Sequence, residues 1–272
     1  MRGRLATLAT ALGIVLVAVL PLVWVLKMSL ITRRELFASP PTILPEDITF
    51  DAYGTVFSDP AFRRALLNSV IIAGATTIIA VGLGALAAYA LARLRLPFRT
   101  FLMTGILALA FFPAVAIIAP LFVEFRKLGI LDSYVAVILV DTVFALPLAV
   151  WILTAFFRQL PRELEDAAKI DGATTLQTFR HVIVPVSAPG VFTASILTFI
   201  AAWNEFLFAS TFLFDGAHWP VTVVIPNFAT LYTTDYGAQA AAAIVVTVPL
   251  VLLVLLFQRR IVSGLTAGAV KG

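Results

Sequence analysis

The chain contains no cysteine and carries little charge for its length. It therefore has no disulfide, no thiolate metal ligand and no cysteine nucleophile. Charged residues make up 12% of its 272 residues, against about 25% in soluble globular domains. The phosphate-binding pattern Gly-x-x-x-x-Gly-Lys-Ser/Thr is also absent from the sequence. We expect a non-catalytic chain with no metal site and no bound cofactor of its own.

Apolar residues are abundant instead. They make up 61% of the sequence, and the mean hydropathy is +1.03, which places the chain among membrane proteins. Six stretches approach or exceed the roughly 20 apolar residues that a helix needs to cross a bilayer. They lie at about 8–30, 66–91, 101–122, 135–157, 190–214 and 238–257. None shows the alternation of a barrel strand, so the sequence predicts an all-α membrane protein with six transmembrane helices in a single domain, 1–272.

The distribution of basic residues predicts the orientation of these helices. Most of the 19 Lys and Arg residues fall in segments that share one side of the membrane with both termini. Such a bias marks the cytoplasmic side, so we expect both termini to be cytoplasmic. The same bias accounts for the net charge of +4 without a nucleic-acid partner. The first apolar stretch is long enough to span, and we expect it to be retained rather than removed as a signal peptide.

A polar segment at 158–189, which we call the docking loop, separates the fourth and fifth apolar stretches. Pro161 is suited to open a helix there, and Glu163, Glu165 and Asp166 would lie in its first turn, where the helix dipole favours negative charge. Gly172 stands where that helix would stop, because glycine adopts a left-handed backbone conformation without a Cβ clash.

A second short helix is predicted to follow. Thr174 and Gln177 have the spacing of a capping box, and Pro185 would end the helix before the next span. Such a pair of helices either tethers the loop to the membrane surface or docks a soluble partner. Interfacial tethers usually combine large apolar residues with lysine and arginine. The small residues and carboxylates of the first helix favour docking.

The docking loop resembles the EAA loop of binding-protein-dependent ABC importer permeases. The resemblance rests on Asp166-Ala167-Ala168-x-x-x-Gly172 and on the run from Phe179 to Pro185. Asp166 occupies the place of the motif's glutamate, so Glu165 is a candidate to replace it. Leu67-Asn68-Ser69, Ala202-Trp203-Asn204-Glu205 and the tail at 258–272 are similar to the carbohydrate-uptake branch, the maltose- and trehalose-type second permeases.

This resemblance implies a fold, a function and partners. The chain would be one permease subunit in a bacterial cell membrane, paired with a second permease and served by an extracytoplasmic sugar-binding protein. Two copies of a cytoplasmic ATPase would bind ATP and magnesium, and one of them would dock on the loop of this chain. The substrate would be a di- or oligosaccharide such as trehalose or maltose. The implied docking residues are Glu165, Asp166, Ala167, Ala168, Asp171, Gly172, Phe179 and Pro185.

Two ionisable residues fall within the predicted spans, Asp141 in the fourth and Glu205 in the fifth. Such residues are costly in lipid, about 2.5–3.5 kcal/mol on insertion scales, and are functional candidates. With Trp203 and Asn204 they would line a sugar pathway or a subunit interface. They would alternatively lie near helix ends, or act as ion sites in a proton- or ion-coupled secondary transporter, although the inverted repeats typical of that class are not evident.

The Pro-rich segment at 31–65 is long enough for a short surface helix near 50–57. That helix would either pack as a cap over the ends of the spans or contact an external partner.

Overall fold

The computed structural model describes residues 2–229 and 234–267, with side chains described over 7–229 and 234–258. Within these ranges the chain is helical apart from loops and two isolated β-bridges. Contacts divide it into two compact units. Unit 1 comprises residues 1–66 and 223–249, and unit 2 comprises residues 67–222 and 250–272.

Unit 1 begins with α1 (Arg2–Leu30), followed by the short helices α2 (Arg33–Leu36) and α3 (Asp51–Ser58). It also holds the start of α4 (Pro60–Arg93), the second half of α13 (Val221–Val224), η2 (Ile225–Phe228) and the first part of α14 (Tyr236–Ala267). The helix α3 confirms the short helix predicted near 50–57. Phe62 is fully buried, and its ring contacts those of Phe57 and Phe228.

Unit 2 is built on α7 (Tyr134–Gln159), which packs against α11 (Ala188–Trp203) and α5 (Arg99–Leu109). Two glycines show how closely its helices approach. A Cβ at Gly84 would lie 3.0 Å from the Cβ of Ala149, and one at Gly190 would lie 2.4 Å from the Phe156 ring. Small residues of this kind let helices pack in lipid, where the hydrophobic effect supplies little drive between them.

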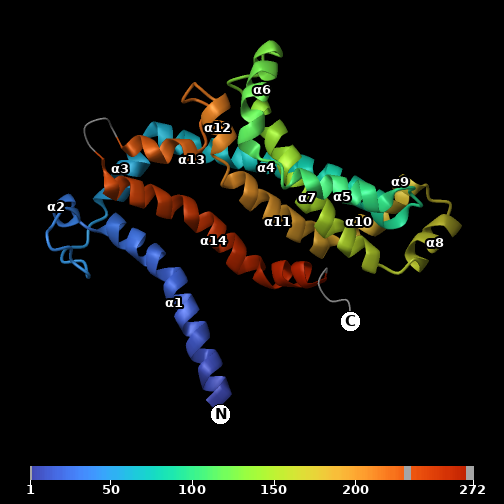
Figure 1. The fold of residues 1–272 in the computed structure, drawn as a ribbon, viewed down its shortest axis with the longest axis horizontal. Coiled ribbons are helices and arrows are strands. Elements are labelled where there is room, and N and C mark those ends of the chain that lie inside the picture. The colour runs from blue at the N-terminus through green and yellow to red at the C-terminus, as the bar shows by residue number, and fades with distance from the viewer. Residues whose placement is uncertain (1, 230–233, 268–272) are drawn as a thin grey trace. The chain divides into compact units, whose positions relative to one another are not determined.

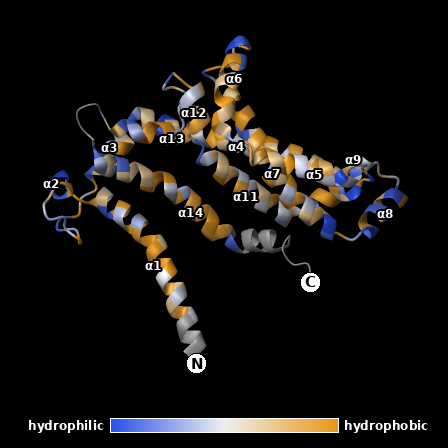
Figure 2. Cartoon of the chain, in the orientation of Figure 1, coloured by the Kyte–Doolittle hydropathy of each residue, from blue (hydrophilic) through white to orange (hydrophobic). Residues whose placement is uncertain are grey.

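Along the chain, α6 (Ala114–Lys127) comes between α5 and α7. The helices α8 (Glu163–Ile170) and α9 (Thr175–Thr178) and the π-helical turn η1 (Phe179–Ile183) come between α7 and α11. The short helices α10 (Val184–Val186) and α12 (Leu207–Phe212) flank α11. Figure 1 shows α8 and α9 together at one end of unit 2. Figure 2 shows hydrophilic and hydrophobic residues mixed within α8.

Within the residues that the structure describes, four helices are long and apolar enough to cross a membrane in one piece, at Thr7–Leu30, Pro60–Arg93, Tyr134–Gln159 and Tyr236–Gln258. The count reaches six if each of two bent helix pairs is one span. The stretch predicted at 101–122 is such a pair, because α5 and α6 meet at a bend of 85°. Pro113 lies at this break, where its missing N–H donates no helical hydrogen bond.

The stretch predicted at 190–214 is not one helix either. It belongs to a pair bent by 80°, Thr175–Val186 with Ala188–Trp203, and α11 then ends at Trp203 before α12 begins. The C-terminal stretch extends beyond its predicted bounds, since α14 runs to Ala267. The predicted tail at 258–272 therefore starts inside a helix, and its last five residues, 268–272, lie outside the described residues.

Candidate functional site: the docking loop

The docking loop is held to unit 2 through Arg93 at the end of α4. The Nε atom of Arg93 lies 3.5 Å from Oε1 of Glu165 in α8, and both side chains are almost fully buried. Arg93 also donates from Nη2 to the carbonyl oxygen of Leu160 over 2.6 Å. Glu165 accepts a further hydrogen bond from the Tyr89 side chain. One buried cation thus joins α4, the end of α7 and the first turn of α8.

The turn after α8 is a Schellman motif. Gly172 adopts φ +79°, the left-handed conformation predicted for it. Its N–H donates to the carbonyl of Lys169 over 3.0 Å, and the N–H of Ala173 donates to that of Ala168 over 2.9 Å. These two bonds satisfy carbonyls that the helix end would otherwise leave free. The turn therefore has a defined geometry.

The capping box predicted for the second helix is also present. Thr174 caps α9 by accepting from the Gln177 N–H, and the Gln177 side chain accepts from the Thr174 N–H over 2.8 Å. The prediction for Pro185 is wrong. Pro185 lies in the first turn of α10, where a missing N–H is tolerated. The break comes after it, at Ser187.

Phe179 anchors the far end of the loop. Its ring centroid lies 5.1 Å from that of Tyr89 in α4 and 6.4 Å from that of Phe157 in α7. Ile183, one turn on, is fully buried in the same cluster. Phe179 thus fixes the loop to the spans, and only part of its side chain remains accessible.

Apart from the half-buried Phe179, the residues that the sequence predicts for docking fall into two groups. Glu165 and Ala168 face inward and are buried. Exposed residues form the outer face of the loop: Asp166, Ala167, Asp171 and Gly172, together with Pro185. Asp166 makes only an exposed ion pair with Lys169, 3.1 Å from Nζ to Oδ1. Its carboxylate is accessible to a partner, whereas that of Glu165 is committed to Arg93.

Two large apolar residues at the same place were not singled out by the sequence analysis. Ile170 at the end of α8 is 87% exposed, and Leu176 in α9 is 66% exposed. They flank the Gly172 turn. The sequence contains one indication of their exposure. Ile170 and Leu176 are large apolar residues within a polar segment, and each lies close to a predicted helix end. Both side chains are therefore accessible at the outer side of the loop.

The polar residues predicted in the spans lie around the end of α11. Both carboxylate oxygens of Glu205 accept backbone N–H groups of α12, from Phe208 over 2.6 Å and from Ala209 over 3.0 Å. Glu205 thus caps a helix, as the helix-end alternative expected. Asn204 donates to the carbonyl of Ile200 over 2.7 Å.

Trp203 and Asp141 are buried, 4% and 5% exposed. The Trp203 Nε1 atom and the Asp141 Oδ2 atom have no hydrogen-bond partner among the described residues. Buried polar atoms in native proteins are nearly always paired. These two atoms, like the buried hydroxyls of Thr142 and Thr198 on the same two helices, have no partner among the described residues.

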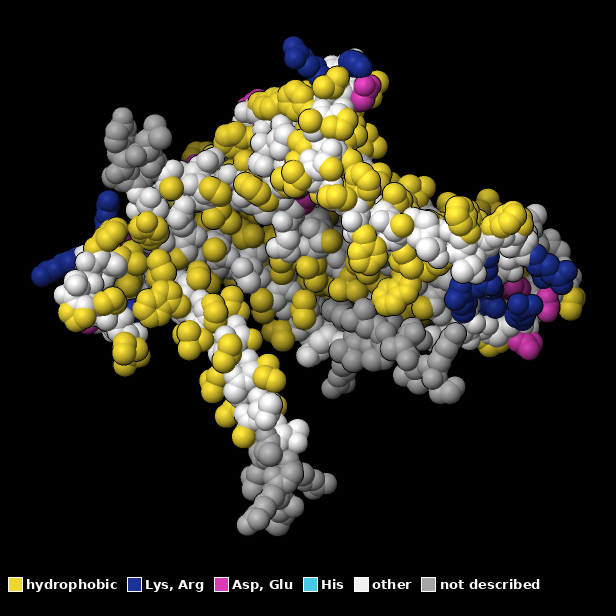
Figure 3. Space-filling model, viewed as in Figure 1, with side chains coloured by type: hydrophobic (Ala, Val, Ile, Leu, Met, Phe, Trp, Pro, Cys, Tyr) yellow, Lys and Arg dark blue, Asp and Glu magenta, His cyan; other side chains and the backbone are white. Residues whose placement is uncertain are grey.

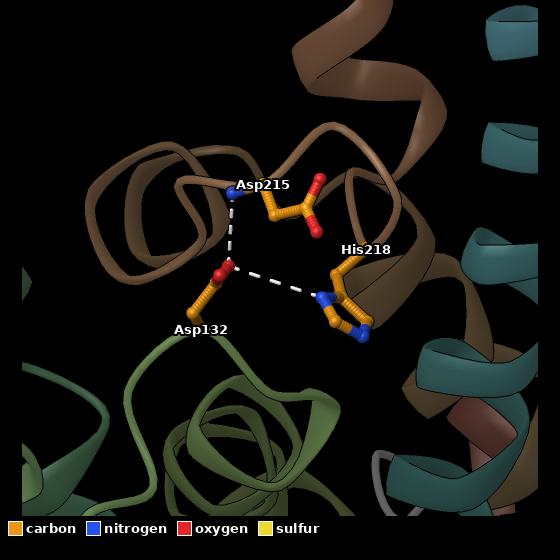
Figure 4. Close-up of side chains that lie close together, drawn as sticks. All are labelled: Asp132, Asp215 and His218. Carbon is orange, nitrogen blue, oxygen red and sulfur yellow. Dashed lines mark hydrogen bonds and ion pairs between the residues drawn. The ribbon is translucent and has the colours of Figure 1, made fainter.

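A cluster that the sequence analysis did not find joins the α6–α7 loop to the loop after α12 (Figure 4). Asp132 accepts the N–H groups of Phe214 over 2.9 Å and Asp215 over 3.0 Å, and His218 Nδ1 lies 3.9 Å away. The hydrogen bonds from Asp215 and Phe214 hold the pKa of Asp132 below its ordinary value, and His218 acts in the same direction.

This cluster has the composition of a cation site, since one ligand atom from each of Asp132, Asp215 and His218 lies within 4.8 Å of the others. However, Oδ1 of Asp132 and Oδ1 of Asp215 both accept backbone N–H groups. We assign the cluster to loop closure. Asn68 reinforces the same region by donating to the carbonyls of Ala217 and Trp219, each over 2.9 Å.

The fold and the docking loop define a helical membrane protein in which a structured polar element, 158–189, lies between two apolar stretches. Comparison with known proteins gives the family. Residues 80–266 match the family described as binding-protein-dependent transport system inner membrane component. The chain belongs to this family of ABC importer permeases.

Two relatives and one solved structure illustrate the similarity. The chain is 45% identical to the trehalose transport system permease protein SugB of Mycobacterium tuberculosis (strain CDC 1551 / Oshkosh), over all of both chains. It is 42% identical to the sulfoquinovosyl glycerol transport system permease protein SmoH of Agrobacterium fabrum (strain C58 / ATCC 33970), over 93% of this chain and 88% of that one. The structure of a bacterial ABC transporter that imports alginate superposes with a TM-score of 0.80 at 24% identity, covering 95% of this chain and 96% of that one. This last similarity confirms the fold.

Proposed function

We propose that this chain is one permease subunit of an ATP-driven importer for a di- or oligosaccharide, and that its docking loop couples it to a cytoplasmic ATPase. The observation that carries the proposal is the two-sided construction of the loop. Its inner side is fixed to α4 and α7 by Arg93, Glu165 and Phe179. Its outer side presents Asp166, Ile170 and Leu176 to solvent. A rigid element with an exposed apolar tip is suited to transmit movement.

The partners follow from this role. A second permease would complete the pathway, two ATPase copies would bind ATP and magnesium, and an extracytoplasmic binding protein would deliver the sugar. The loop would face the cytoplasm together with both termini, in a bacterial cell membrane. Apolar side chains along α1 are exposed in the chain by itself, which suits contact with lipid or with the second permease.

Trehalose is the first substrate to test, because SugB, which the chain matches over its full length, is named for trehalose transport. SmoH has a different named substrate at nearly the same identity, so the sugar must be measured directly. We expect binding-protein-dependent uptake of labelled trehalose in vesicles that contain the whole transporter. Uptake of maltose but not trehalose would keep the proposed class and change the sugar. Uptake of neither sugar would reject trehalose and maltose as substrates.

The docking surface is tested with Ile170→Asp and Leu176→Asp. Each places a charge on an exposed position, so folding and insertion should be unchanged while the ATPase no longer co-purifies with the chain. Leu128→Asp is the matched control, because Leu128 is 68% exposed and lies beyond the C-terminal end of α6, away from the loop. Normal ATPase recovery with both loop variants would contradict the proposed docking surface.

A further inference from the structure

Two arginines face one cavity where α5 begins and α7 ends. The cavity has a volume of about 520 Å³ and is lined by Arg99, Thr100, Met103, Thr104 and Arg158. Arg99 is the first residue of α5, Arg158 lies in the last turn of α7, and the two helices are in contact. Thr100 and Thr104 are one helical turn apart and therefore present their hydroxyls on the same face.

The cavity contains positive charge without compensation. No carboxylate lines it, and neither arginine forms an ion pair with any residue that the structure describes. The Arg99 Nε atom is buried and also has no hydrogen-bond partner in that part of the chain. Arg93, by contrast, is paired with Glu165. Two like charges beside one space repel each other and attract an anion.

The position of the cavity indicates where such an anion would come from. Arg158 stands in the last turn of the Tyr134–Gln159 span, which places it at the border between hydrocarbon and water. Figure 3 shows Lys and Arg side chains gathered at the end of unit 2 that carries α8 and α9. Within α5 no residue is buried, and Phe101 beside the cavity is 77% exposed. The basic cavity fits the phosphate of a lipid, and the exposed apolar face of α5 beside it fits the acyl chains of the same lipid.

We propose that Arg99 and Arg158 bind the phosphate of an anionic phospholipid, in the leaflet on the side of the docking loop. Arginine suits this ligand, because its planar guanidinium donates two hydrogen bonds to one phosphate. Thr100 and Thr104 supply further donors, and the acyl chains lie along the exposed face of α5. Basic pockets at the ends of spans are suited to acidic lipid headgroups. This site is independent of whether the loop docks an ATPase.

The test measures lipid binding to the purified full-length chain in detergent by native mass spectrometry. The probe is dioleoylphosphatidylglycerol, with dioleoylphosphatidylcholine and inorganic phosphate as comparison ligands. We expect the anionic lipid to bind in preference to the zwitterionic one. In Arg99→Gln/Arg158→Gln its affinity should fall about tenfold or more, the effect of losing one or two charge-assisted hydrogen bonds.

Arg95→Gln is the matched control, because Arg95 is an exposed arginine of the same region that does not line the cavity. It should leave the affinity unchanged. If the double glutamine variant does not fold, Arg99→Lys/Arg158→Lys keeps the charge, loses the planar fork and should bind with intermediate affinity. Equal lipid affinity in wild type and the double variant would overturn the proposal. Inorganic phosphate that displaces the lipid at matched concentration would overturn the assignment to lipid.

Discussion

At the scale of single residues, neighbouring acids in the docking loop have different tasks. Glu165 is buried against Arg93, whereas Asp166, at the motif's glutamate position, is exposed. The resemblance implied that both acids would belong to the docking surface, but which of them faces inward depends on how α8 packs against α4. In this chain the intramolecular ion pair uses Glu165 and leaves the Asp166 carboxylate available.

Removing Glu165 should therefore loosen the loop. Glu165→Ala leaves the Arg93 guanidinium buried without its counter-charge, which typically costs about 3 kcal/mol. We expect a lower thermal midpoint for the purified chain and weaker coupling of ATP hydrolysis to transport. The double variant Arg93→Ala/Glu165→Ala should cost less than the sum of the single variants. Additive losses would show that the pair does not act as a unit.

Asp132 gives a prediction for pH. Because the pKa of Asp132 is lowered in the folded chain, its carboxylate stabilises the fold at neutral pH. That stabilisation is lost as the pH falls below the ordinary aspartate pKa of about 4 and through the folded value. We expect the thermal midpoint of wild type to drop more steeply over this acid range than that of Asp132→Asn. If the thermal midpoints of wild type and Asp132→Asn fall in parallel with pH, the Asp132 carboxylate does not stabilise the fold.

At the scale of elements, caps were the most predictable features. The Gly172 stop and the Thr174–Gln177 capping box depend on side-chain chemistry within one turn, so a single sequence is enough to find them. The broken helices were not predictable in the same way. Hydropathy reports whether a stretch is apolar but not where it bends, so it predicts one span at 101–122 and one at 190–214. Pro113 was visible in the sequence, but prolines occur within membrane helices without breaking them, as Pro120 does in α6.

The Gly172 turn can be tested against another glycine of the same conformation. Gly129 has φ +69° and Gly172 has φ +79°, so alanine at either position costs about 1–2 kcal/mol of backbone strain. Gly172→Ala should reduce the coupling of ATP hydrolysis to sugar uptake, and Gly129→Ala should not. The measurement is transport-stimulated ATPase activity of the assembled complex. Equal effects of the two substitutions would indicate a general loss of stability rather than a role for the docking loop.

At the scale of the whole molecule, the sequence predicted an all-α membrane protein of the ABC importer permease class, and the fold and family confirm it. It did not predict the apolar tip of the loop or the basic cavity beside α5. Whether Ile170 and Leu176 are exposed depends on how the helices pack. Arg99 and Arg158 are 59 positions apart in the sequence and line one cavity because α5 contacts α7. Features that depend on tertiary packing need the structure.

The central claim is that the exposed tip of the docking loop contacts an ATPase, and the absence of cysteine allows a direct test. In this experiment the native cysteines of the ATPase are replaced and one cysteine is then introduced on its surface. Leu176→Cys supplies the only thiol of this chain. We predict a disulfide cross-link between the two subunits in assembled membranes that changes in yield when ATP is added. Ser187→Cys, at a fully buried position, should not cross-link. Absence of any cross-link from Leu176→Cys, with the complex intact and every ATPase surface position tried, would contradict the claim.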